Sequence, residues 1–279
     1  MFQPFHDVVS NVSNTIHEHA KKLGLPVIGV MPAYFPMELI HAAGAYPVQL
    51  WGNNLPLGKS DAYLQSYCCS VARSILELEL IGGADMVQAY AFTSLCDTLI
   101  NLREIFRRVF PKPTVELSMP MTQTEEARQT YLKSVIQGVV KGLEKITGQE
   151  ITPESLAEAA NLYGRIRALQ RQLYEIRRNK PGLMNNLDFY RAIKAGFFLP
   201  AAVYHHMLED LIEGLEKIPA SVSNRPKLLL SGLVFDPIAI HGILDDLDVH
   251  VIDDDFANGW RTVSKKDLDV GNLVEGVTE

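Results

Sequence analysis

Residues 26–51 read PVIGVMPAYFPMELIHAAGAYPVQLW, and this stretch determines the predicted fold class. Its first six residues form a short apolar run that is typical of a buried parallel strand. Residues 36–43 predict a helix that begins at a proline and ends at Gly44, and residues 46–51 predict a second strand. A strand, a helix and a strand in this order predict a right-handed unit of a parallel sheet.

The same alternation continues on both sides of this stretch. Toward the N-terminus, residues 5–23 predict an amphipathic helix that ends at Gly24. Toward the C-terminus we expect a helical stretch interrupted near two adjacent cysteines, then a strand, a helix and a strand, at residues 60–80, 84–91, 96–109 and 114–118. Residues 122–218 show a helical pattern throughout. Beyond Pro226 the α/β alternation returns, with strands at 227–231 and 249–253 and a helix at 237–247.

These patterns predict two Rossmann- or flavodoxin-like parallel-sheet domains with a helical insert between them. Residues 1–120 would form the N-terminal α/β domain, residues 121–222 the helical region, and residues 223–279 the start of a second α/β domain. An open sheet usually holds about four to six strands, and only two are evident after residue 223. We therefore expect this second domain to be incomplete and the chain to be part of a longer protein.

Composition narrows the possible functions. The 279 residues are 47% apolar, which is enough for a substantial core, and the formal net charge of −7 comes without a Lys/Arg-rich face. This balance argues against nucleic-acid binding. No run reaches the roughly 18 apolar residues of a membrane span, and the N-terminus lacks the apolar core of a signal peptide. We expect a cytoplasmic protein whose three cysteines are free thiols.

Three candidate functional residues follow predicted strands. Glu38 lies at the start of the helix after the first strand, Cys69 lies after the second, and Cys96 begins the helix after the third. The carboxyl ends of parallel strands meet at one edge of a sheet, where ligands bind, so these residues can share a site. A helix N-terminus favours a thiolate, which is the form that binds iron. Buried, inert cysteines fit the same spacing equally well.

Other polar groups have ordinary explanations beside functional ones. Zinc is less favoured because none of the histidines stands at ligand spacing from a cysteine. His41 follows Glu38 by one helical turn, which is usually an ordinary polar pair. The run Asp253–Asp255 would orient a ligand or bind a cation, or else form a solvated loop with a helix cap. The basic residues Arg177, Arg178 and Lys180 would bind the phosphates of a ligand or simply be solvated.

Three segments together resemble the benzoyl-CoA reductase and 2-hydroxyacyl-CoA dehydratase family, which includes the 2-hydroxyglutaryl-CoA dehydratase D-component. Residues 36–48 match its P-x-E-L-I-x-A-A-G-x-x-P-V core, and residues 61–79 and 92–102 are similar to its first two cluster-cysteine segments. By matching position, Cys69 and Cys96 would ligate a [4Fe–4S] cluster. Cys68 is an alternative to Cys69.

The resemblance implies an iron–sulfur subunit of a low-potential reductase that acts on an aromatic acyl-CoA by one-electron transfer. The partners would be an identical or paralogous subunit and a separate ATP-dependent, ferredoxin-linked activator. Glu38 would handle protons or shape the site, or only interact with its helix dipole. The alternatives are a subunit of a 2-hydroxyacyl-CoA dehydratase, and a cluster-free paralogue that pairs with a catalytic subunit.

Two departures bear on this choice. The family supplies a third cysteine toward its C-terminus, whereas no cysteine follows Cys96 in this sequence. Either the chain is truncated or its cluster has been lost. Dehydratases of the family tend to have a Ser or Thr where Ala33 stands here, and the segments around Trp51 and before Cys68 favour the reductase branch.

Overall fold

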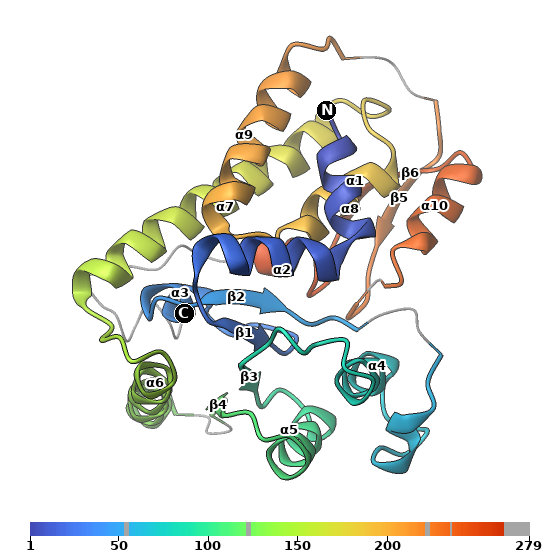
Figure 1. The fold of residues 1–279 in the computed structure, drawn as a ribbon. Helices are drawn as coiled ribbons and strands as arrows, with labels where there is room; N and C mark the ends of the chain where they lie inside the picture. The colour runs from blue at the N-terminus through green and yellow to red at the C-terminus, as the bar shows by residue number, and fades with distance from the viewer. Residues whose placement is uncertain (53–55, 121–123, 221–223, 235, 265–279) are drawn as a thin grey trace. The chain divides into compact units, whose positions relative to one another are not determined.

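The structure is a computed structural model, and it describes residues 1–52, 56–120, 124–220, 224–234 and 236–264 (Figure 1). The expectations for residues 121–123 and 265–279 therefore lie outside the described residues. The chain divides into two compact units, each considered by itself. The described residues between 16 and 160 belong to one unit, called the cysteine unit below. Residues 1–15 and 161–264 form the described part of the other, called the second unit.

The cysteine unit is built on a parallel sheet of four strands. The strands are β1 (Val27–Val30), β2 (Tyr46–Gln49), β3 (Ala89–Thr93) and β4 (Thr114–Leu117), in the order β2-β1-β3-β4. Its helices are α3 (Met37–Ala42), the 3-10 helix η1 (Lys59–Ala62), α4 (Ser70–Leu80), α5 (Asp97–Val109) and α6 (Glu125–Thr147), preceded by α2 (Val12–Leu23).

The strand order places a topological switch point between β1 and β3. The chain runs outward from β1 to β2 and then returns past β1 to form β3 on the other side. In open parallel sheets, ligands bind at the carboxyl ends of the strands beside such a point. We therefore expect a ligand-binding site at the loops that leave β1 and β3.

The two faces of the sheet are packed differently because side chains alternate along a strand. Ala89 and Ala91 of β3 belong to the apolar core formed with α3 and α6. Tyr90 and Phe92 instead contact Phe106 of α5 in edge-to-face pairs, with ring centroids 4.8 and 5.5 Å apart. Each such pair adds about 0.5–1.5 kcal/mol beyond area burial, so this packing fixes α5 on the sheet.

Gly52, which follows β2, approaches α4 closely. Its φ is +90°, a conformation that side-chain-bearing residues rarely adopt, and a Cβ placed there would lie 2.0 Å from Ser74 Oγ. Only glycine lets the loop after β2 pass this close to α4. The contact helps to set the position of the helix that Cys69 precedes.

The second unit combines helices with a pair of parallel strands. The strands are β5 (Lys227–Leu230) and β6 (His250–Asp254), and the helices are α1 (Gln3–Ser10), α8 (Asn186–Ala195), α9 (Ala201–Glu216), α10 (Ala239–Asp246) and α11 (Trp260–Val263). α7 (Pro153–Asn179) begins in the cysteine unit and ends in this one. α8 packs against both α1 and α10.

The structure confirms an α/β protein with a parallel sheet and changes two details of the prediction. The helix expected at 5–23 is two helices, because α1 ends with Asn11 as its C-cap. The third strand begins at Ala89 rather than Ala84, because residues 84–87 form a turn closed by the Val87 N–H and the Ala84 carbonyl, 3.0 Å apart. The division at residues 120 and 222 stays a prediction. Within the described residues, every helix is too short or too polar to cross a bilayer.

Candidate functional site

Both predicted cluster cysteines stand immediately before a helix. Cys69 is the N-cap residue of α4 and Cys96 is the N-cap residue of α5, and neither side chain makes a capping hydrogen bond. Both thiols are exposed and free. The predicted placement of Cys96 at a helix start is thus confirmed, and α4 begins at the interruption expected near the cysteine pair. Both thiols remain accessible to a ligand. A role as iron ligands stays a prediction.

A cavity of about 670 Å³ joins the two cysteine segments. Cys68, the residue before Cys69, lines it, and so do Asp97 and Thr98, which follow Cys96. Sites for small molecules typically have volumes of about 300–1,000 Å³, so this cavity is in the usual range. The cavity is lined by two segments that are about 30 residues apart in the sequence, the loop before α4 and helix α5.

The walls of this cavity offer mixed chemistry. Tyr63 and Tyr67 contribute aromatic rings, while Asn101, Glu104 and Arg108 contribute polar groups along α5. The tyrosines are 46% and 84% exposed, so their rings are open to a bound molecule. Sequence analysis placed several of these residues in the two cysteine segments, but it did not predict that the segment before Cys68 and α5 line one cavity.

A buried carboxylate holds the segment that leads to the cysteines. Glu77 of α4 accepts hydrogen bonds from the backbone N–H groups of Gly58, Lys59 and Ser60, at 3.0, 3.2 and 2.8 Å. The hydrogen bonds from Ser60 and Gly58 lower the pKa of Glu77 to about 2. An ion pair between Asp61 of η1 and Arg73 of α4 holds the same segment. The start of the cysteine loop is therefore fixed to the helix that Cys69 caps.

The carboxyl ends of β3 and β4 place hydroxyl groups near Cys96. Ser94 Oγ donates to Ser118 Oγ at 3.3 Å and accepts from the Met119 N–H at 3.1 Å. Thr93, the last residue of β3, is fully buried, and its hydroxyl has no hydrogen-bond partner among the described residues. An unsatisfied buried hydroxyl is unusual, and it lies at the strand end where a ligand is expected.

Glu38 lies in the first turn of α3 and is only 5% exposed. His41 lies in the last turn of the same helix. Burial lowers the pKa of His41, while the carboxylates of Glu38 and Glu158 act in the opposite direction. This electrostatic influence of Glu38 on His41 is consistent with the ordinary polar pair expected from the sequence. Glu38 is not among the residues that line the cavity beside Cys68.

In the second unit, Asp254 is the centre of a buried network. Its Oδ2 accepts hydrogen bonds from the hydroxyl groups of Tyr190 and Tyr174, at 2.6 and 3.0 Å. Its Oδ1 accepts the N–H of Trp260, the first residue of α11, at 3.0 Å. The helix cap expected for the acidic run is therefore present. The expectation of a solvated loop is wrong for Asp254, which is 3% exposed.

The basic residues of this unit are engaged with the unit itself. Arg177 is buried, with Nη1 3.5 Å from Asp254 Oδ2, and Arg178 binds both oxygens of Asp253 at 2.9 and 3.0 Å. Lys180 donates to the carbonyl of Ile218 at 2.9 Å, just beyond the end of α9. The alternative of simple solvation is wrong for Arg177 and Arg178. Because these contacts already engage the side chains of all three basic residues, they disfavour the alternative of phosphate binding.

The fold and the geometry of the site define a class of protein. It is an α/β protein with a parallel sheet, a switch point between its first and third strands, and exposed thiols at the N-termini of two adjacent helices. The family model described as 2-hydroxyglutaryl-CoA dehydratase, D-component, matches residues 32–278, and the chain belongs to this family.

Curated relatives agree with the family assignment. The chain is 28% identical over 261 residues to the (R)-phenyllactyl-CoA dehydratase beta subunit of Clostridium sporogenes, covering 93% of this chain and 70% of the relative. It is 29% identical over 235 residues to a benzoyl-CoA reductase subunit of Thauera aromatica, covering 82% and 61%. For the (R)-2-hydroxyglutaryl-CoA dehydratase beta subunit of Acidaminococcus fermentans, the identity is 29% over 272 residues, covering 94% and 71%.

These three relatives are subunits of enzymes, and the comparisons are consistent with an enzyme-subunit role for this chain. The chain spans between 61% and 71% of their lengths. Both branches expected from the sequence, reductase and dehydratase, are represented at nearly equal identity. The choice between them therefore rests on other grounds.

Proposed function

We propose that this chain is the iron–sulfur subunit of a low-potential reductase that acts on an aromatic acyl-CoA. In this proposal Cys69 and Cys96 ligate a [4Fe–4S] cluster, with Cys68 as an alternative to Cys69. The observation that carries the proposal is the shared cavity, which is lined both by the residue before Cys69 and by the residue after Cys96. The acyl-CoA would approach the cluster through this cavity.

The donor chemistry of the residues fits a cluster, although their number falls short of a complete set. Iron–sulfur clusters are usually held by four thiolates. Cys69 and Cys96 occupy the N-cap positions of α4 and α5, and their thiols are exposed and make no hydrogen bond to the helix backbone. All three cysteines of the sequence lie among the described residues, so further thiolate ligands would come from a cysteine outside these 279 residues. When bound, the cluster would supply single electrons at low potential to a thioester-activated substrate.

The chain's own side chains would bind and orient the substrate. Tyr63 and Tyr67 would stack against an aromatic acyl group, and Asn101 would hydrogen-bond its polar atoms. Glu38 would act in proton handling or in shaping the site, although an interaction with the dipole of α3 explains its position equally well. A paralogous or identical subunit and an ATP-dependent, ferredoxin-linked activator would complete the system.

We further propose that β5 and β6 begin a second Rossmann- or flavodoxin-like domain, and that the helices between the two sheets form an insert. The parallel pairing of β5 with β6 through α10 supports this proposal. The ring-reducing branch is preferred because Ala33 stands where dehydratases of the family tend to have Ser or Thr. The dehydratase branch is the alternative for the same site.

Anaerobic purification tests the proposal. The protein is expressed in a host with active cluster assembly, and iron and acid-labile sulfide are measured per chain. We expect a brown protein with an iron-to-sulfide ratio near one, as is usual for a cubane cluster. Benzoyl-CoA should perturb the visible spectrum of this protein, whereas free coenzyme A should not. A colourless, iron-free protein under these conditions would contradict the proposal.

The count of cysteines favours a second candidate, a cluster-free subunit that pairs with a catalytic paralogue. The sequence has only three cysteines, and two of them are adjacent. This candidate predicts that Cys69→Ser and Cys96→Ser leave both complex assembly and turnover unchanged. Turnover lost with assembly intact would support the cluster-bearing role instead.

A further inference from the structure

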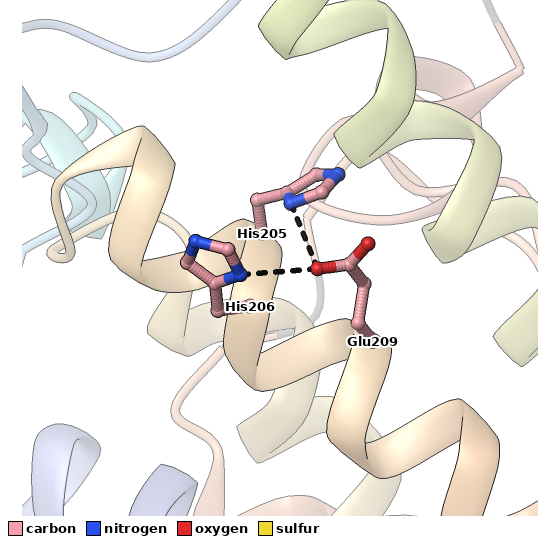
Figure 2. A group of neighbouring side chains, drawn as sticks. All are labelled: His205, His206 and Glu209. Carbon is pink, nitrogen blue, oxygen red and sulfur yellow. Dashed lines mark hydrogen bonds and ion pairs between the residues drawn. The ribbon is translucent and has the colours of Figure 1, made fainter.

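A group of metal-binding side chains lies on α9, in the second unit. Figure 2 shows His205, His206 and Glu209, whose ligand atoms all lie within 4.8 Å of one another. His205 Nδ1 is 3.2 Å from Glu209 Oε2, and His206 Nδ1 is 3.1 Å from the same oxygen. The two imidazole rings therefore converge on one carboxylate.

Helical spacing explains why these three side chains meet. Glu209 follows His205 by four residues and His206 by three, and both spacings place side chains on neighbouring positions of a helix surface. The rings of the two histidines stand at an interplanar angle of 77°, with centroids 5.6 Å apart. Neighbouring imidazoles thus approach the carboxylate from different directions, as ligands around one ion must.

The exposure of the three side chains suits a site that is anchored and still accessible. The side chain of His205 is 9% exposed, which fixes its ring against the unit. The side chains of His206 and Glu209 are 78% and 49% exposed, so an ion can reach them from solvent. One fixed side chain and two accessible ones thus offer three ligand atoms to an ion that arrives from solvent.

The distances suit a tetrahedral ion. Zn²⁺ binds histidine nitrogen at about 2.0–2.1 Å and carboxylate oxygen at about 2.0–2.2 Å, which puts neighbouring ligands of a tetrahedron roughly 3.3–3.4 Å apart. The two separations from a histidine Nδ1 to Glu209 Oε2, 3.1 and 3.2 Å, differ from this by only a few tenths of an ångström, and all three ligand atoms lie within 4.8 Å of one another. Small side-chain adjustments would therefore admit the ion.

We propose that His205, His206 and Glu209 form a binding site for a divalent transition-metal ion, with Zn²⁺ as the ion that fits best. Two imidazoles and one carboxylate favour Zn²⁺ over Mg²⁺ or Ca²⁺, which prefer all-oxygen ligands. Three protein ligands leave a coordination position for water or for a donor from another molecule. This site is formed by side chains other than the cysteines, and it does not depend on the proposed cluster.

The test must separate this site from the thiols of Cys68, Cys69 and Cys96, because free cysteine thiols are also zinc ligands in proteins. A variant with all three cysteines changed to serine, free of any polyhistidine tag, serves as the background. Zinc chloride is titrated into this protein by isothermal calorimetry, with equilibrium dialysis and metal analysis giving the stoichiometry. We expect one Zn²⁺ per chain.

Single substitutions in that background then locate the ion. His206→Ala and Glu209→Gln each remove a solvent-exposed ligand, so the fold should persist, as circular dichroism will check. Each should weaken zinc binding at least about tenfold, since it removes a direct ligand. His17→Ala changes an exposed histidine of α2 and is the matched control, which should leave the affinity unchanged.

Cobalt gives an independent readout. Co²⁺ bound to these three side chains in tetrahedral geometry should produce a strong visible absorption that His206→Ala abolishes. The proposal is overturned if the cysteine-free protein binds no zinc, or if His206→Ala and Glu209→Gln bind zinc as tightly as the background does.

Discussion

At the residue scale, two buried carboxylates of α4 show how the cysteine unit is held together. Glu77 receives three backbone N–H groups from the segment before the cysteines, whereas Glu79 receives Lys112 Nζ at 2.7 Å and the Tyr90 hydroxyl. Burial and the Glu79 carboxylate both raise the pKa of Tyr90, which keeps its hydroxyl a donor. Each carboxylate is compensated, but by a different kind of partner.

Glu77→Gln should destabilise the cysteine unit by about 2 kcal/mol at neutral pH, since a neutral amide accepts these backbone hydrogen bonds more weakly. The pKa of Glu77 in the folded protein is lowered from 4.5 to about 2. Its stabilising effect is therefore complete above pH 4.5 and is lost as the pH falls toward 2. Urea unfolding between those pH values should show this loss in the wild type and not in Glu77→Gln.

Glu126→Gln on α6 is the matched control for Glu77→Gln, because it removes the same charge from an exposed position. This variant should keep the wild-type dependence of stability on pH in the acid range. An identical acid dependence in Glu77→Gln and the wild type would mean that the Glu77 contacts do not stabilise the folded state.

Lys112→Met should lower the free energy of unfolding by about 3 kcal/mol, because it leaves the buried Glu79 carboxylate without its cationic partner. Lys141→Met, at an exposed position of α6, should change the free energy of unfolding by less than about 0.5 kcal/mol. Urea midpoints of the two variants give the comparison. Equal effects would show that the contact between Lys112 and Glu79 contributes nothing.

At the element scale, the position of α4 depends on the loop after β2. Gly52→Ala should destabilise the unit by about 1–3 kcal/mol, because it adds a Cβ that would lie 2.0 Å from Ser74 Oγ and forces alanine to a φ of +90°. Ser74→Ala in the same chain removes the nearest atom and should recover part of that loss. A double-mutant cycle of urea midpoints measures the coupling.

The cycle has a clear negative result. If the effects of Gly52→Ala and Ser74→Ala add within about 0.3–0.5 kcal/mol, the two positions do not interact. The close approach of the loop to α4 would then not be what positions the helix.

Sequence patterns predicted most elements because short apolar runs, glycines and prolines mark strand and helix ends locally. They also placed Cys96 at a helix start and an interruption of the helical stretch near Cys69, where the structure begins α5 and α4. They did not predict the contacts that hold these elements. The carboxylate of Asp254, for example, binds hydroxyl groups from residues 64 and 80 positions earlier in the chain. Such pairings arise only when the chain folds.

The same limit applies to the site. The cavity beside Cys68 is formed by the loop before α4 and by one face of α5, and periodicity does not reveal which residues of two separate segments meet. The buried hydroxyl of Thr93 was missed for a related reason, because a threonine at the end of a strand is ordinary in sequence. Only its lack of a partner among the described residues of the folded chain makes it notable.

At the scale of the whole molecule, the family relationship and the geometry point to the same region. The family model matches residues 32–278, which include both cysteine segments and the strands β2, β3 and β4 of the sheet that positions them. The central claim is that Cys69 and Cys96 hold one iron–sulfur cluster together, beside the cavity that their neighbours line. Because the two cysteines cap separate helices, each should be needed independently.

Iron and acid-labile sulfide per chain, measured after anaerobic purification of Cys68→Ser, Cys69→Ser and Cys96→Ser, test this claim most directly. We predict that Cys69→Ser and Cys96→Ser each lose the cluster, while Cys68→Ser keeps iron and sulfide at the wild-type level. Wild-type iron and sulfide in both Cys69→Ser and Cys96→Ser would contradict the claim.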